Sequence, residues 1–307
     1  MHSKSLTVAT VSMFGVFGLY MATAQNKRAE TSNEVKVANA LKAADLRIPE
    51  SAKEDKKKVL VFSVTNGYRH KAIGIGKQTF EMMSEQTNAF DVVISDDLEN
   101  FDKGKIEQFD AICFLNTTQN VFAPHKNKLK KMSDVDKKVH KKLELARKEN
   151  LMDFIEGGKG FIGIHSATDT FYEWPEYGNM IGGYFDGHPW RSKSEVSIKA
   201  DKENKDHALL EGVIPENGEL RFKEEIYQFK DPYDSKKLTM LLRLDVENSD
   251  KVKKMNRKDG DYGVGWIKNH KEGRVFYSSL GHNDHIYYNK HVLRHYYAGI
   301  MYALGLE

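Results

Sequence analysis

The stretch GFIGIHSATDT, residues 160–170, decides the fold and contains the first candidate site residue. Its apolar first half, residues 160–164, has the length and composition of a strand buried on both faces, and the polar residues after it indicate a turn. In open α/β sheets, ligands bind beyond the carboxyl ends of the strands, where loops and helix N-termini face a crevice. His165 lies at this strand end, so we predict that a site is centred on it.

Similar apolar runs precede and follow this stretch, and helical patterns separate the earlier ones. Residues 59–64, 90–97 and 109–118 are predicted strands, whereas residues 72–87 and 289–307 have the spacing of buried helix faces. Alternating strands and helices predict an α/β fold with a doubly wound, mostly parallel sheet and helices on both faces. Added strands are predicted in the C-terminal half, at residues 195–200, 219–229, 238–245, 262–269 and 273–282, the last two as a hairpin.

The bulk composition fits a globular domain. The 307 residues are 40% hydrophobic and 11% aromatic, which is enough for a sizeable core. A net charge of +3 gives no reason to expect nucleic acid as a partner. We find no strong boundary after residue 58, so residues 58–307 are predicted to form one domain.

The N-terminus has the pattern of an export signal. Lys4, an apolar run and the exit Ala22-Thr23-Ala24 predict a signal peptide at residues 1–24. The alternative is an uncleaved anchor. The single Cys113 excludes an internal disulfide, which favours a periplasmic location without stable membrane insertion after cleavage. Residues 25–57 are predicted to be a linker or short surface helix with little order.

One segment, residues 126–148, is strongly basic. It is expected to form the exposed front of a long helix that ends at Gly157-Gly158. Two interpretations remain open: a solvated helix face, or a surface attracted to an anionic membrane or polyanion.

Histidines and one glutamate recur at strand ends and in aromatic loops. If their side chains converge, they would suit general acid/base catalysis or metal binding. Each also has a structural interpretation, because a lone buried histidine is usually part of the packing, Glu225 beside Glu224 fits a charged strand end, and a tryptophan fits the core. The segments are Asn66–His70, His165–Ser166, His188–Trp190, Glu224–Tyr227 and Gly281–His282.

The stretch G-I-H-S-A, residues 163–167, is similar to the strand-to-helix elbow of nucleophilic enzymes, but its apex is His165. This disfavours an acyl-enzyme at the apex and leaves Ser166 as an alternative nucleophile. No P-loop is present, and Gly74 and Gly76 lack the third glycine of a dinucleotide fingerprint.

Several stretches together resemble the ThuA-like family, named for trehalose utilisation, over residues 58–306: TNGYRH, FLNTT, GKGFIGIHSATDT, EYGNMIGGYFDGHPW, EEIYQF and GRVFYSSLGH. The resemblance implies a flavodoxin-like, class I glutamine amidotransferase-like fold whose elbow cysteine is replaced by His165, so amidotransferase activity is not implied. It also implies a role in disaccharide catabolism, with 3-keto sugars as substrates.

We therefore predict a periplasmic enzyme acting on a small carbohydrate, with isomerase, lyase or hydrolase chemistry by acid/base catalysis. The alternative is a non-catalytic carbohydrate-binding or scaffold protein. The sequence fixes no cofactor, metal ligand or oligomeric state, and a divalent metal ion that polarises the substrate carbonyl stays open. The predicted catalytic residues are His165, His188, Glu225 and His282, and the predicted substrate-binding residues are Asn66, Tyr68, Arg69, His70, Ser166, Trp190 and Tyr227.

Overall fold

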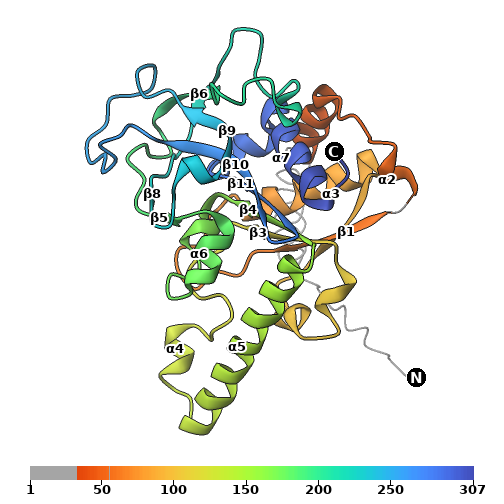
Figure 1. Ribbon diagram of the computed structural model, residues 1–307, viewed down its shortest axis with the longest axis vertical. Coiled ribbons are helices and arrows are strands. Elements are labelled where there is room, and N and C mark those ends of the chain that lie inside the picture. Colours follow the sequence, from red (N-terminus) through yellow and green to blue (C-terminus); the bar gives the residue numbers. More distant parts are fainter. Residues whose placement is uncertain (1–32, 55) are drawn as a thin grey trace, which may run out of the picture.

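The computed structural model describes residues 33–54 and 56–307, whose strands form one large mixed sheet and one small one. The predicted signal peptide at residues 1–24 lies outside this range. The large sheet has nine strands among the described residues, in the order β2-β1-β3-β4-β11-β10-β9-β6-β7 (Figure 1). The predicted α/β fold with added C-terminal strands is confirmed.

Five neighbouring strands of the large sheet are parallel, in the order β2-β1-β3-β4-β11. Strand β4 is buried throughout and is flanked on both sides, which explains its continuous apolar sequence. The order matches the 2-1-3-4-5 arrangement of flavodoxin-like sheets, with β11 as the fifth strand. The five strands are β1 (Lys57–Phe62), β2 (Phe90–Ile94), β3 (Ala111–Leu115), β4 (Gly160–Ile164) and β11 (Gly273–Ser278).

The other four strands extend the sheet in antiparallel fashion from β11. They are β10 (Gly263–His270), β9 (Thr239–Leu244), β6 (Glu195–Ala200) and β7 (Leu220–Lys223). The predicted β10–β11 hairpin is confirmed, with Gly273 paired to His270. The single strand predicted at residues 219–229 is instead split into β7 and β8 (Phe229–Lys230), which pairs with β5 (Tyr184–Phe185). β7 ends at Lys223, and the carboxylate of the next residue, Glu224, accepts hydrogen bonds from backbone N–H groups of another loop.

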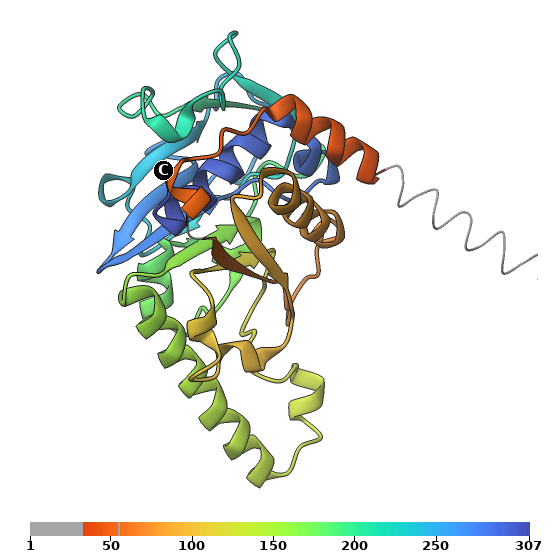
Figure 2. The same cartoon turned by 90° about the vertical axis from the view of Figure 1, so that its right-hand side faces the viewer.

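Helices cover both faces of the sheet, and each face has its own apolar core. Helices α3 and α7 pack in one core, and α5 and α6 pack in the other (Figures 1 and 2). The helices are α2 (Ser51–Glu54), α3 (Ile73–Thr87), α4 (Lys126–Leu129), α5 (Asp134–Glu156), α6 (Pro175–Ile181) and α7 (Lys290–Leu304). The short 3₁₀ helices are η1 (Leu98–Phe101), η2 (Ile106–Gln108), η3 (His165–Asp169), η4 (Ala208–Leu210), η5 (Ser235–Lys237) and η6 (Asp284–Tyr288).

Residues 33–44, part of the segment predicted to be a linker or a short surface helix, form a packed helix. Val37, Leu41 and Ala44 are completely buried in the core that also contains α3 and α7. Their spacing places all three on one helical face, which the polar composition of the segment conceals. This part of residues 25–57 therefore belongs to the domain.

The basic segment forms an arm that projects from the body. Helix α4 and the front of α5 extend beyond the sheet (Figure 1). Helix α5 ends at Glu156, directly before the predicted glycine pair Gly157-Gly158. On this arm Val135, Val139 and Leu145 are exposed. No helix within residues 33–54 and 56–307 is long and apolar enough to cross a membrane.

Candidate functional site

The elbow predicted at the end of β4 is present. His165 follows β4 directly and has a φ of 51°, a left-handed conformation that is costly for a residue with a side chain. Tyr277 Oη donates to the His165 carbonyl at 2.7 Å, and the Ser279 carbonyl lies 2.7 Å from His165 Nδ1. Because a carbonyl only accepts, Nδ1 carries the proton and Nε2 presents a lone pair.

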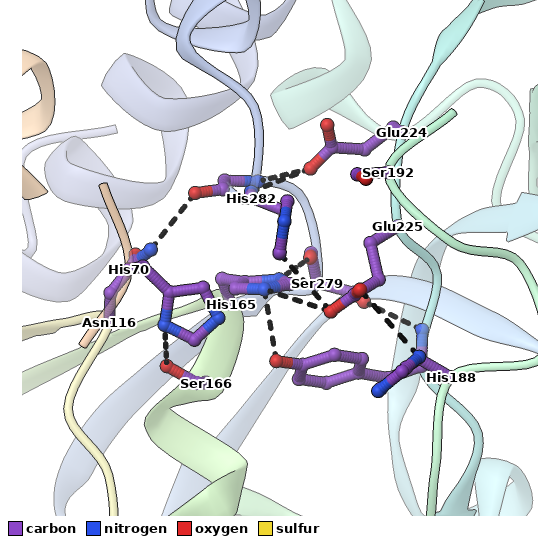
Figure 3. A network of polar contacts seen from close by, with 12 residues as sticks. His70, Asn116, His165, Ser166, His188, Ser192, Glu224, Glu225, Ser279 and His282 are labelled. Atoms are coloured by element: carbon purple, nitrogen blue, oxygen red, sulfur yellow. Dashed lines mark hydrogen bonds and ion pairs between the residues drawn. The ribbon is translucent and has the colours of Figure 1, made fainter. Parts of the chain in front are cut away.

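Four side chains from separate parts of the chain converge beside this elbow (Figure 3). His70, His165, Glu225 and His282 each offer one nitrogen or oxygen atom, and these atoms all lie within 4.8 Å of one another. Glu225 Oε1 lies 3.2 Å from His282 Nδ1 and 3.7 Å from His165 Nε2. The convergence on which the sequence hypothesis depended is therefore observed, while the roles of the four residues remain predictions.

Two further predicted residues contact this cluster. His188 Nδ1 lies 3.6 Å from Glu225 Oε2, on the side opposite the His282 contact. Tyr227 Oη lies 2.9 Å from His165 Nε2. Burial raises the pKa of Tyr227 well above its ordinary value, so the hydroxyl stays protonated and donates to that nitrogen.

Glu224 clamps the loop that carries His282. The Glu224 Oε1 atom accepts from the backbone N–H of Gly281 at 3.1 Å and of His282 at 2.6 Å, and Oε2 accepts from Asn283 N–H at 3.1 Å. Burial nevertheless raises the pKa of Glu224 to about 8, against the opposing effect of these donors. Adjacent glutamates thus act differently, since Glu224 positions a loop and Glu225 faces the histidines.

The environment divides the histidines into two kinds. Burial, with the neighbouring His282, lowers the pKa of His70 to about 4, and burial lowers that of His165 well below its ordinary value. Both rings are therefore neutral near pH 7. Burial also acts to lower the pKa of His282, but the hydrogen bond and charge of Glu225 outweigh it, so the pKa of His282 is raised.

Of the other predicted binding residues, some contact the cluster and others do not. Ser166 Oγ lies 3.3 Å from His70 Nδ1, and the exposed Tyr68 ring packs edge-on against His70 with 4.8 Å between centroids. Asn66 instead donates to the carbonyls of Asn120 and Ala123, and Arg69 donates to that of Ser63. These two side chains therefore bind backbone carbonyls of loops and make no hydrogen bond to the cluster.

Trp190, predicted to line the pocket, is completely buried. Its ring packs edge-on against Tyr262, and Nε1 donates to the Asp250 carbonyl at 3.0 Å. In this conformation neither face of the ring is open to a ligand, so the residue fits the core interpretation.

Sequence reasoning missed the groups that position the cluster. The Ser279 carbonyl fixes the His165 ring, and Asn116 Nδ2 holds the Gly281 carbonyl at 2.9 Å. Tyr287 Oη donates to the same Gly281 carbonyl at 3.2 Å. A backbone carbonyl has no sequence signature, whereas Asn116 at the end of β3 carries the usual strand-end signal.

A pocket of about 750 Å³ adjoins the cluster at His188. A cavity of this size is within the range of small-molecule sites. Most of the residues that line it are of polar types: Asp186, Gly187, His188, Pro189, Arg191, Ser194, Gln228, Val252, Lys253, Lys254 and Asn256.

The sheet order and the histidine elbow define a flavodoxin-like α/β domain with an antiparallel extension and no nucleophile at its apex. The model of the ThuA family, described as trehalose utilisation, matches residues 58–303, so the chain belongs to this family. This confirms the resemblance drawn from the sequence, and the family places the protein in carbohydrate catabolism.

Two solved structures have the same fold. A ThuA-like protein from Bacteroides uniformis ATCC 8492 is 20% identical with a TM-score of 0.54, over 77% of this chain and 87% of its own. One from Parabacteroides merdae ATCC 43184 is 14% identical with a TM-score of 0.54, over 82% of this chain and 91% of its own. No curated protein matched the sequence.

Proposed function

We propose that this protein is an exported enzyme that acts on a 3-keto derivative of a disaccharide by proton transfer beside the carbonyl. The family supports a carbohydrate substrate, and the pattern of residues 1–24 supports export to the periplasm. A carbonyl at carbon 3 acidifies the C–H bond at carbon 2, so a positioned base and a hydrogen-bond donor are sufficient catalysts.

The observation that carries the proposal is the contact of Glu225 with two histidines. His188, half-exposed beside the pocket, lies 3.6 Å from one carboxylate oxygen, and His282 lies 3.2 Å from the other. A carboxylate behind an imidazole orients the ring and stabilises the imidazolium that forms when it accepts a proton. The same carboxylate raises the pKa of His282, which favours a proton donor at that position.

In the proposed reaction, the substrate C2–H bond breaks and its proton passes to His188. The electron pair moves toward the carbon 3 oxygen, and the His282 imidazolium donates a hydrogen bond to this oxygen as negative charge develops. Return of a proton to carbon 3, with the proton of the carbon 2 hydroxyl passing to the carbon 3 oxygen, completes an isomerisation to the 2-keto sugar. Breakage of the C1–O bond, with a proton taken up by the leaving oxygen, completes an elimination that releases the second sugar. His165 helps to position these groups, because its Nε2 atom lies 3.7 Å from Glu225 Oε1 and accepts a hydrogen bond from Tyr227 Oη.

The test is turnover of a 3-keto-disaccharide by the full chain and by His188→Gln and His165→Ala. We expect His188→Gln to lose about 100- to 10,000-fold in kcat/KM, the usual contribution of a general acid or base. His165→Ala should also lose activity, because it removes the contacts with Glu225 and Tyr227. His140→Gln, on the projecting arm, is the matched control and should retain activity. If both site variants are folded by circular dichroism and turn over substrate at the wild-type rate, the proposal is wrong.

A carbohydrate-binding protein without catalysis is the alternative that the polar pocket alone would support. Calorimetry separates the two functions. Binding of the keto sugar without any product, with or without added divalent metal ions, would favour the binding protein.

A further inference from the structure

We propose that His70, His165, His282 and Glu225 form a binding site for one divalent transition-metal ion. An ion here would polarise the carbonyl oxygen of the substrate beside His188. This role of the ion rests on the proposed function. Metal binding itself is measured without any substrate.

The distances are close to those of a metal site. The four candidate ligand atoms lie within 4.8 Å of one another. Around an ion with ligands at about 2.0–2.2 Å, two opposite ligands are separated by about 4.4 Å at most. Shifts of less than about 1 Å, within the range of side-chain adjustment, would therefore bring all four atoms to bonding distance.

The rings are oriented as metal ligands require. The Ser279 carbonyl accepts a hydrogen bond from His165 Nδ1–H, so Nε2 is the ring nitrogen with a lone pair. Tyr227 Oη donates to this lone pair at 2.9 Å and would have to turn away when an ion binds. His70 Nδ1 faces Ser166 Oγ at 3.3 Å, and its other nitrogen points toward His165 (Figure 3). Metal-binding histidines are held in the same way, through a hydrogen bond at the nitrogen that does not bind the ion.

The three imidazoles also pack around a common point. Their ring centroids are 4.7 Å apart for His70 and His165, 5.2 Å for His70 and His282, and 5.4 Å for His165 and His282. Each pair is close to perpendicular, with interplanar angles of 86°, 88° and 77°. Three imidazoles this close to one another fit a shared ion, in agreement with the 4.8 Å limit on the separation of the candidate ligand atoms.

His295 shows what a buried histidine looks like without a site. It is completely buried and packs against the rings of Phe276 and Tyr296. Among the residues that the structure describes, neither of its nitrogens has a hydrogen-bond partner. His165 is equally buried but is surrounded by two imidazoles, a carboxylate and an orienting carbonyl.

The donor set selects the class of ion. Three imidazole nitrogens and one carboxylate oxygen suit Zn²⁺ and the divalent iron, cobalt and nickel ions, whereas Mg²⁺ and Ca²⁺ prefer sites made of oxygen atoms. A substrate oxygen would enter a remaining position on the side of the exposed residues Tyr68 and His188. Without an ion, the proton of His282 stabilises the negative charge on the carbonyl oxygen. A bound ion would stabilise the same charge more strongly.

The test uses the full chain after dialysis against EDTA, titrated with ZnCl₂ by calorimetry and with CoCl₂ by visible absorption, without substrate. We expect one equivalent of each ion and a higher Tm with Zn²⁺. Glu225→Gln and His165→Ala should weaken binding at least 10-fold. His140→Gln reports adventitious binding by a histidine outside the cluster. His188→Gln, which keeps all four ligands, should bind with unchanged stoichiometry.

Less than 0.2 equivalent bound by the wild type, or equal affinity in the folded Glu225→Gln and His165→Ala variants, would overturn the metal site. Keto-sugar turnover that is insensitive to EDTA would then leave the proposed function standing. One bound equivalent without turnover of any 3-keto-disaccharide would instead keep the metal site and remove the proposed function.

Discussion

The N-terminal half of the large sheet, strands β1–β4, and the C-terminal half, strands β6, β7 and β9–β11, bring different chemistry to the same cluster. The first half supplies His70 and His165, which burial keeps neutral. The second supplies Glu225 and His282, together with the loop clamp Glu224. Neither half contains a complete site. The candidate chemistry therefore requires both halves, which meet where β4 pairs with β11.

The largest expected effect separates the two adjacent glutamates of the C-terminal half. Glu225→Gln removes the charge shared by three histidines, so kcat/KM should fall about 1,000-fold or more. Glu224→Gln keeps an oxygen that accepts backbone N–H groups, so a loss of only about 10-fold is expected. Steady-state kinetics on both variants provide the measurement. Equal losses would show that the carboxylate facing the histidines has no special role.

A backbone change at the junction tests whether its close packing is required. A Cβ at Gly281 would lie 2.8 Å from Tyr287 Oη and 3.1 Å from His165 Cβ, at a φ of +135°. Gly281→Ala should therefore lower the free energy of unfolding by about 2–4 kcal/mol. Gly104→Ala is the matched control, since Gly104 also has a positive φ of +84° but open space around it, and should cost about 1 kcal/mol. Urea denaturation measures both variants. Similar losses of unfolding free energy in Gly281→Ala and Gly104→Ala would contradict the argument that a Cβ at Gly281 is too crowded.

The two halves should also respond to pH with opposite sign. The folded-state pKa of His70 is lowered from 6.5 to about 4, so its contribution to stability is present above pH 6.5 and is lost as pH falls toward 4. The pKa of Glu224 is raised from 4.5 to about 8, so its contribution is present below pH 4.5 and is lost as pH rises toward 8. Each effect should amount to several kcal/mol, because one pKa unit corresponds to about 1.4 kcal/mol.

Urea denaturation between pH 4 and 9 checks these signs. The stability of the wild type relative to His70→Asn should decrease on acidification, and its stability relative to Glu224→Gln should decrease as the pH rises. If the free energy of unfolding changes with pH in the same way in the wild type and both variants, the pH dependence does not come from His70 and Glu224.

The smallest effect is expected on the projecting arm. Replacing Lys137, Lys138 and Lys142 with glutamate should change activity less than 2-fold and stability by less than about 0.5 kcal/mol, because these side chains are exposed. Co-sedimentation with vesicles containing phosphatidylserine distinguishes the two interpretations of the arm. Binding by the wild type that the triple variant loses would favour attraction to an anionic membrane over a solvated helix face.

The sequence predicted the elements that depend on local pattern. Strand β4 and its elbow follow from an apolar run that ends at His165, and the end of α5 follows from its terminal glycines. The packed helix at residues 33–44 was missed because three buried residues, among them Val37 and Leu41, are diluted by polar ones.

The sequence predicted which strand ends carry the candidate site residues, but not the contacts between those residues. Contacts such as that of Glu225 with His165 join residues far apart in the chain, and tertiary packing alone brings them together. Trp190 shows the limit of composition, because an aromatic residue in a polar loop fits a binding surface and the core equally well. The difference between Glu224 and Glu225 depends on which side of the chain each one faces after β7 ends.

The central claim, proton transfer at carbon 2 of a 3-keto sugar, is tested most directly with a 3-keto-disaccharide deuterated at that carbon. Mass spectrometry and NMR of the product in ordinary water report where the label goes. Proton abstraction by His188 predicts a product without deuterium at carbon 2, and no such product from His188→Gln. A product that retains the label at carbon 2 would contradict the claim.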